Sequence, residues 1–434
     1  MILFGFKYNQ SSLNLSSILR YLLIITPVFM LSFKHWINLS VVIIFLYSLS
    51  YLYKKEFFTL NSYKLLFDRK YVCLTFFMFV FPLVSVGIGQ ILRYDLYLPN
   101  FDAPLRLFLC GFIFIAICNG CFNENKNKLI SIYWLRYILP ISLIFIFLFR
   151  PAWSDQWGNY LITTYFVDPL SFGQICLFFT LITILSLYIS LTQKHINYFY
   201  IIFLIFSLMI GLFLAASSGS RTGWVGLPII LTLYSIYFKN NFTRKLYSYI
   251  LIILIIILSL YFIYVNKFLY NKIFSFFNEF INYKWYMPNK EGSADLRISI
   301  FRMGLFYFLE RPLQGWGDLG WKVAINSIEI SQYTSEAARL IPEKGFHNEI
   351  LTNSVRSGVF GLLSSVMIFL MPFIISIKFI FNEKNKKIGI FLLTFIVHQF
   401  IAGLSTEVTH LIYLSSFFGL TLALLIGEGF YNAK

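Results

Sequence analysis

The chain has 434 residues, of which 58% are hydrophobic and 12% are charged, and its formal net charge is +16. Charged residues make up roughly a quarter of a typical soluble domain, so this composition excludes an ordinary soluble protein. The apolar residues fall in blocks of about 20, which is the length of helix that crosses a hydrocarbon core. Because backbone groups in lipid must pair within their own segment, helices are favoured. We therefore expect an all-α polytopic integral membrane protein.

Twelve apolar spans are predicted along the chain, which should form a single membrane domain over 1–434. A long polar loop, 267–349, separates the ninth span from the tenth. An even number of spans places both termini on the same side of the membrane. The predicted spans are 18–33, 37–53, 71–92, 105–122, 129–149, 169–191, 197–216, 221–238, 245–266, 350–377, 388–405 and 409–427.

The basic residues of the short loops predict the orientation, because such residues collect on the cytoplasmic side. Loops on the side of the termini carry most of them, for example Lys54, Lys55, Lys126, Lys128 and Lys384. The opposite loops carry little beyond Lys34, Arg93, Arg150 and Arg221. Both termini should therefore be cytoplasmic, and 267–349 extracytoplasmic. This orienting role explains the net charge better than a nucleic-acid partner, for which no module is visible.

An amphipathic helix is predicted inside the long loop. Ser293 can cap its N-terminus. Pro312 disfavours helical geometry at the residue before it, so the helix should end near Glu310. One face is expected to carry residues that recur at helical spacing, namely Arg297, Phe301, Leu305 and Phe308.

Three arginines are candidate ligands for an anion. Arg221 follows a run of small residues between two apolar spans, where closely packed helices would hold its guanidinium in place. A guanidinium matches a diphosphate bidentately; the alternative is an ordinary interfacial arginine. Arg297 and Arg302 lie roughly 140° apart on the loop helix, so they cannot both face one site. Arg297 is nearer the helix N-terminus, which favours anions, whereas Arg302 fits a solvated role.

His347 is the histidine of the long loop and is a candidate general base. A neutral imidazole can accept the proton of an attacking hydroxyl, but a histidine beside a helix start is also a common structural residue. Asn348 has a structural explanation as the cap of the following helix. Glu407 and His410, in the last extracytoplasmic turn, are possible secondary residues. Further polar residues that could contribute to the same rim are Asp102, Arg106, Arg150 and Asp168.

Motifs for metal or nucleotide chemistry are missing from the sequence. There is no HExxH, no P-loop and no GxSxG elbow, so no metal or other cofactor is expected. The five cysteines lie within or at the edges of apolar spans and show neither a disulfide nor a zinc spacing. A reaction outside the cytoplasm without ATP needs a substrate that carries its own leaving group. A lipid diphosphate is the natural candidate.

Three stretches together resemble the bacterial O-antigen ligases, within the superfamily that also holds O-antigen polymerases and protein O-oligosaccharyltransferases. The order is an arginine at a span mouth, an arginine on a loop helix, and His-Asn before an apolar span. The stretches are LAASSGSRTGWVGLP at 214–228, LRISIFRMGL with ERPLQGWG at 296–317, and FHNEILTNSVRSGVFGLL at 346–363.

The resemblance implies a metal-independent glycosyltransferase of the bacterial inner membrane with a periplasmic active site. Such an enzyme moves a polysaccharide from undecaprenyl diphosphate to a sugar of the lipid A-core, with inversion at the anomeric carbon. By the same resemblance, Arg221 and Arg297 would hold the diphosphate and His347 would activate the acceptor hydroxyl. The implied partners are the undecaprenyl-diphosphate-linked glycan, the lipid A-core acceptor and membrane lipids, with no nucleic acid.

Two other kinds of function stay open. An O-antigen polymerase would use the same lipid-linked donor with a lipid-linked glycan as acceptor, and a protein oligosaccharyltransferase would use a protein. A lipid-linked glycan flippase or another transporter would belong to a different class. Transporters typically show repeated halves and ionisable residues at mid-membrane, whereas the charges here gather in one late loop.

Overall fold

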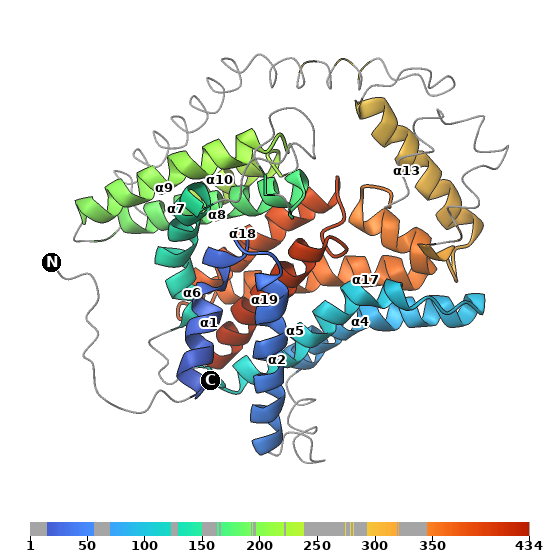
Figure 1. The fold of residues 1–434 in the computed structure, drawn as a ribbon, viewed down its shortest axis with the longest axis horizontal. Helices are drawn as coiled ribbons and strands as arrows, with labels where there is room; N and C mark the ends of the chain where they lie inside the picture. Colours follow the sequence, from blue (N-terminus) through green and yellow to red (C-terminus); the bar gives the residue numbers. More distant parts are fainter. Residues whose placement is uncertain are drawn as a thin grey trace.

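The computed structural model describes most of the chain as a bundle of helices (Figure 1). Within the described residues every regular element is a helix, apart from an isolated bridge between Thr164 and Val167. The all-α prediction is therefore confirmed. The described residues are 15–55, 70–122, 129–149, 163–164, 166–191, 193, 197–220, 223–237, 274, 278, 281, 293–318, 320 and 345–433.

Among the described residues, nine helical segments are long and apolar enough to cross a membrane, which makes this a multi-pass membrane protein. Each coincides with a predicted span. They are α2 (Trp36–Lys54), α4 (Lys70–Arg93), α5 (Asp102–Cys118) with the short η1 (Leu98–Phe101) before it, the continuous α6, η2 and α7 (Ile130–Tyr133, Trp134–Ile138, Leu139–Phe149), α8 (Pro169–Leu191), α9 (Tyr198–Ser217), α17 (Glu349–Ile380), α18 (Lys386–Gly403) and α19 (Ile412–Asn432).

The other three predicted spans are not all described, so the number twelve stays a prediction. The first corresponds to α1 (Leu15–Phe29), an apolar helix of 15 residues that is shorter than a full span. The span expected at 221–238 contains α10 (Gly226–Tyr237). The span expected at 245–266 lies outside the described residues.

Helices α8 and α19 form the centre of the bundle. In the 18-residue apolar stretch of each helix, 89% of the residues of α8 and 94% of those of α19 are buried, against 33% for the outer helix α2. Gly419 of α19 lets this helix approach α5, because a Cβ there would lie 2.8 Å from the sulfur of Cys110. Small residues at helix contacts are how packing is achieved in lipid, where the hydrophobic effect between helices is weak.

The loop helix α13 (Ser293–Glu310) has the bounds that the sequence predicts, and it lies beside the start of α17 (Figure 1). The stripe of residues named from the sequence is not the most buried one. Leu305 is 52% exposed, whereas Ile300, Met303 and Tyr307 are buried against Phe346 and Val355 at the start of α17. Helical spacing allows both stripes, and Arg297 at the start of the helix belongs to both of them.

Helix α17 is kinked at Ser357 and Gly358, where Gly358 has a φ of 60° and a ψ of −145°. The turn after α13 packs into this kink: the Trp316 N–H donates to Val355 O over 2.7 Å, and the Val359 N–H donates to Pro312 O over 2.7 Å. Arg93 at the end of α4 donates to the Arg356 carbonyl over 2.9 Å. The backbone groups released by the kink are therefore paired, and α4, α13 and α17 are held together there.

Candidate functional site

His347 occupies a held and unusual backbone position immediately before α17. Its φ is 49°, a left-handed conformation that costs a residue with a side chain about 1–3 kcal/mol. The His347 N–H donates to Glu407 Oε1 over 2.6 Å, and the neighbouring Phe346 N–H donates to Thr352 Oγ1 over 2.9 Å. The His347 side chain is nevertheless 32% exposed. The fold thus fixes the backbone of His347 and leaves part of its ring accessible.

The His347 imidazole is set up to be a neutral base. Burial and the charge of Arg297 lower the pKa of His347 from its ordinary 6.5. Burial raises the pKa of Glu407, whose Oε2 lies 4.0 Å from His347 Nδ1. The first shift keeps the imidazole unprotonated at neutral pH, so the two side chains do not form a salt bridge there. An unprotonated imidazole at a surface is the form that accepts a proton.

Arg297 lies on the side of α13 that faces the start of α17. The residues at its helical spacing, Ile300 and Tyr307, are buried there, and a Cβ on Gly304 would lie 2.6 Å from the Leu351 side chain. The structure therefore brings Arg297 and His347 together from different elements. Arg302 is half-buried and, at five residues from Arg297, points elsewhere around the helix.

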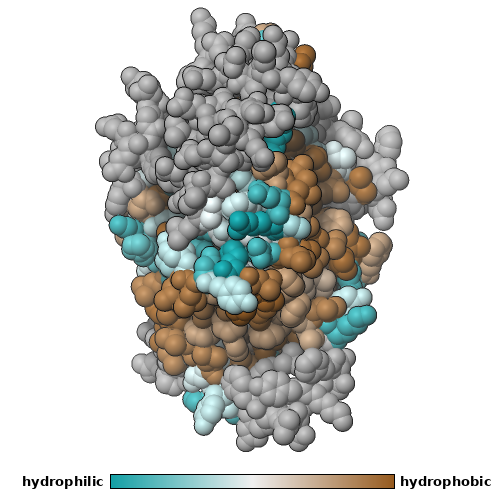
Figure 2. Space-filling view, turned by 90° about the vertical axis from the view of Figure 1, so that its right-hand side faces the viewer, coloured by the Kyte–Doolittle hydropathy of each residue, from teal (hydrophilic) through white to brown (hydrophobic). Residues whose placement is uncertain are grey.

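The face of the molecule formed by α13, the end of α4 and the start of α17 carries both polar and apolar surface. Figure 2 shows a group of hydrophilic residues on this face beside a broad hydrophobic area. Exposed apolar patches rimmed by polar residues mark interaction sites, including sites that contact lipid.

Arg221 lies outside the described residues, so its position relative to Arg297 and His347 stays a prediction. Its described flanks are tightly packed, as the small residues of this stretch predicted. A Cβ on Gly173 of α8 would lie 2.6 Å from Ser220 Cβ, and one on Gly223 would lie 2.6 Å from the ring of His398 in α18.

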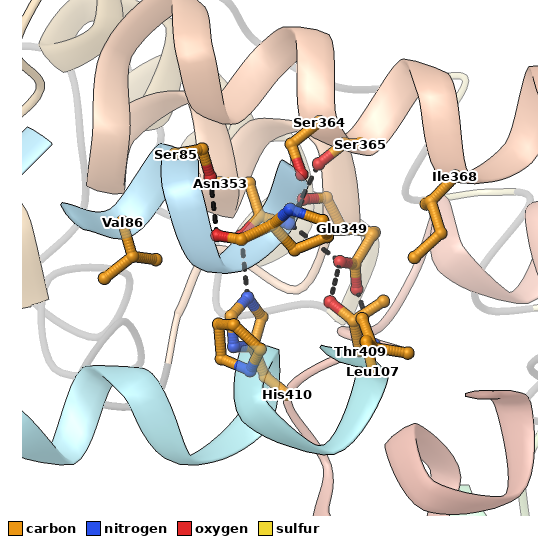
Figure 3. A pocket seen from close by; sticks show the side chains of 12 residues that line it. Ser85, Val86, Leu107, Glu349, Asn353, Ser364, Ser365, Ile368, Thr409 and His410 are labelled. Carbon is orange, nitrogen blue, oxygen red and sulfur yellow. Dashed lines mark hydrogen bonds between the residues drawn. The ribbon is translucent and has the colours of Figure 1, made fainter. Parts of the chain in front are cut away.

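A second polar cluster lies behind His347, between the first turns of α17 and the 404–411 loop that joins α18 to α19. Glu349 Oε2 accepts the Thr409 N–H over 2.9 Å, and Glu349 Oε1 accepts the Asn353 amide over 2.7 Å (Figure 3). Asn353 Oδ1 lies 2.7 Å from His410 Nε2. The cavity among these side chains has a volume of about 10 Å³, close to the minimum for one water molecule and far too small for a sugar.

Both ring nitrogens of His410 lie within hydrogen-bond distance of neighbouring side chains. Arg356 Nη1 lies 2.7 Å from His410 Nδ1, and Arg356 also pairs with Asp318 after α13. Burial and the charges of Arg356 and Arg106 lower the pKa of His410 well below 6.5. His410 is therefore neutral, and its Nε2 lies between Asn353 Oδ1 and Arg356 Nη1, which is 2.5 Å away.

Several residues of this cluster were not singled out from the sequence. Glu349 and Arg356 are ionisable and buried within an otherwise apolar helix, and such residues are unusual enough in a span to indicate a specific role. The presence of these two ionisable residues at the start of an apolar span can be read from the sequence. Asp318 and Arg93 carried no such signal, because both lie outside the predicted spans.

The remaining candidates have structural roles or lie outside the description. Asn348 caps α17, as predicted, with its Oδ1 accepting the Leu351 N–H over 3.0 Å. Asp168 Oδ1 accepts the Ser171 N–H over 2.8 Å at the start of α8. Asp102 and Arg106 pair with each other on α5. Arg150 is outside the described residues.

Comparison with known proteins bears on the central part of the chain. The family model described as "O-Antigen ligase" matches residues 204–366, which contain Arg221, Arg297 and His347. The chain is also similar to an uncharacterized protein of Haemophilus influenzae (strain ATCC 51907 / DSM 11121 / KW20 / Rd), with 23% identity over 214 residues. That alignment covers 48% of this chain and 50% of the relative, so it spans about half of each. The resemblance to the O-antigen ligase family is confirmed by the match over residues 204–366.

Proposed function

We propose that this protein is an O-antigen ligase, which transfers a polysaccharide from undecaprenyl diphosphate to a sugar hydroxyl of the lipid A-core. The family match supports an activity broadly of the O-antigen ligase or polymerase type in a glycosyltransferase-like membrane enzyme. The single observation that carries the proposal is that Arg297 of α13 lies close enough to the partly exposed His347 for its charge to act on the imidazole.

In the proposed reaction, the acceptor hydroxyl attacks the anomeric carbon of the donor sugar. A new carbon–oxygen bond forms, the bond from that carbon to the diphosphate breaks, and its electron pair leaves with the diphosphate. His347 takes the hydroxyl proton. Attack from the face opposite the leaving group inverts the anomeric carbon.

The arginines would act on the leaving group. Negative charge grows on the diphosphate as the glycosidic bond breaks, so guanidinium groups already in place stabilise the transition state more than the ground state. We assign this role to Arg297 and Arg221. Arg302 would contribute little, because it lies on a different side of α13.

The proposed location is the bacterial inner membrane, with both termini cytoplasmic and the site periplasmic. The distribution of lysine and arginine in the loops supports this orientation. His347, Glu407 and the start of α13 would then face the periplasm, where lipid A-core and the lipid-linked polymer meet.

The test is transfer by the purified protein in liposomes that contain the undecaprenyl-diphosphate-linked glycan and one of two acceptors. Transfer to lipid A-core supports the ligase. Transfer to a lipid-linked repeat unit alone would instead identify a polymerase, and translocation of the donor without transfer would identify a flippase. A chelator added to the liposomes should leave the rate unchanged, whereas a strict need for a divalent ion would contradict the metal-independent mechanism.

A further inference from the structure

Glu407 makes more contact with the His347 region than its place in a distant loop suggests. Its Oε1 accepts the His347 N–H over 2.6 Å and the Thr352 hydroxyl over 3.0 Å. Its Oε2 lies 4.0 Å from His347 Nδ1. The Glu407 side chain is 7% exposed, so the carboxylate meets the imidazole on its buried side.

The loop that carries Glu407 is fixed along α17 at three successive places. Glu407 contacts His347 and Thr352, Thr409 contacts Glu349, and His410 contacts Asn353. A side chain on Gly345 has no room, because its Cβ would lie 2.6 Å from Glu407 Oε1. The carboxylate position is therefore set by α17, by the loop and by the chain before His347 at once.

We infer that Glu407 is a positioning residue for His347, which orients the imidazole through Nδ1 and stabilises it when it takes up the acceptor proton. This inference rests on the proposed function and extends it. With Nδ1 turned toward the buried carboxylate, Nε2 is the nitrogen left for the acceptor hydroxyl. A carboxylate 4.0 Å from an imidazolium is worth far more in a buried site than in water.

Other charged groups near His347 and Glu407 also act on the protonation of the imidazole. Arg297 faces His347 from α13, while Arg356 and Glu349 of α17 lie near Glu407. The neutral His410 is bonded to Arg356. Arg297 opposes protonation of His347, whereas the Glu407 carboxylate, with Oε2 4.0 Å from Nδ1, would favour it.

The test is Glu407→Gln, which keeps an acceptor for the His347 N–H and the Thr352 hydroxyl but removes the charge. We expect kcat to fall at least about tenfold with little change in KM for the donor. The acidic limb of the kcat–pH profile should move to lower pH, because the imidazolium loses its carboxylate. Unchanged kcat and an unchanged profile in folded Glu407→Gln would overturn the inference.

A second measurement reads the imidazole without any transfer assay. Diethyl pyrocarbonate acylates unprotonated imidazole, and mass spectrometry of the peptide with His347 gives the pH midpoint of this modification. Glu407→Gln should lower that midpoint, and equal midpoints in both proteins would contradict the inference. If the wild-type protein transfers glycan to neither acceptor, the proposed function fails, but this midpoint still decides whether Glu407 acts on the ring.

Two variants control for folding. Glu407→Asp keeps the charge, so it should retain the wild-type midpoint even though its shorter side chain lowers kcat. The same midpoint shift in Glu407→Asp and Glu407→Gln would overturn the role of the charge. If the glutamine variant does not fold, a midpoint in Glu407→Asp below that of the wild type would overturn it. Glu428→Gln removes another buried carboxylate that accepts backbone N–H groups, far from His347, and should change neither the profile nor the midpoint.

Discussion

Two buried glutamates near opposite ends of α19 both accept backbone N–H groups, but from different kinds of residue. Glu428, near the end of this helix, accepts the Ile130 N–H over 2.7 Å and the Ser131 N–H over 2.9 Å at the start of α6. Glu407, just before the start of α19, accepts the His347 N–H over 2.6 Å. The helix between them places the two carboxylates roughly 25 Å apart.

The two glutamates differ in the residues whose N–H groups they accept. Around Glu428 every partner is buried, so its carboxylate only joins the start of α6 to α19. Around Glu407 one donor belongs to a partly exposed histidine with left-handed backbone and Arg297 nearby. A buried carboxylate thus serves packing at one end of the bundle, and at the other it holds a side chain able to move a proton.

The largest effect expected at the His347 end is on the reaction itself. Asparagine tolerates left-handed backbone, so His347→Asn should keep the fold while removing the base. Transfer in liposomes should fall by about 10²–10⁴-fold. A thermal unfolding curve close to wild type would show that the loss is chemical, and a rate near wild type would remove His347 from the mechanism.

A matched pair of arginine variants on α13 tests which side of this helix faces the site. Arg297→Ala should lower transfer by about 10²–10³-fold, the loss typical of removing one group that stabilises developing charge. Arg302→Ala, about 1.4 turns further along the helix, should change the transfer rate by less than about tenfold. Equal losses in both variants would mean that α13 does not present one arginine to the diphosphate.

The pH dependence is a smaller effect with a defined sign. Because burial and Arg297 lower the pKa of His347, the base stays unprotonated below the ordinary value of 6.5. The rate should therefore hold constant from neutral pH down past 6.5 and then fall by about tenfold per pH unit. The profile of kcat/KM against pH measures this. A midpoint above 6.5 would show that the carboxylate outweighs Arg297 and burial in the free enzyme.

The smallest effect on activity is expected at the other end of α19. Glu428→Ala leaves buried donors of Ile130 and Ser131 unpaired, which should lower the free energy of unfolding by about 1–3 kcal/mol. The rate per folded molecule should stay at the wild-type value. A reduced rate in the folded fraction would mean that the two ends of α19 are coupled.

The sequence alone predicted much of the local structure. The apolar blocks marked nine described spans within a few residues, and Pro312 placed the end of α13 at Glu310. Asn348 was predicted as the cap of α17. These features depend on hydropathy, proline geometry and capping, which act over one or two helical turns and can be read from neighbouring residues.

The packed face of α13, the kink at Gly358 and the pairing of Glu407 with His347 could not be read in this way. Glu407 and His347 are 60 residues apart in the chain, with two helices between them. Whether they meet depends on how α17, α18 and α19 pack, and that packing is shared among many small apolar contacts. The sequence determined which segments are helices and which side chains were available for chemistry. Only the tertiary structure decided that a buried carboxylate lies behind the partly exposed histidine, because that contact has no local signal.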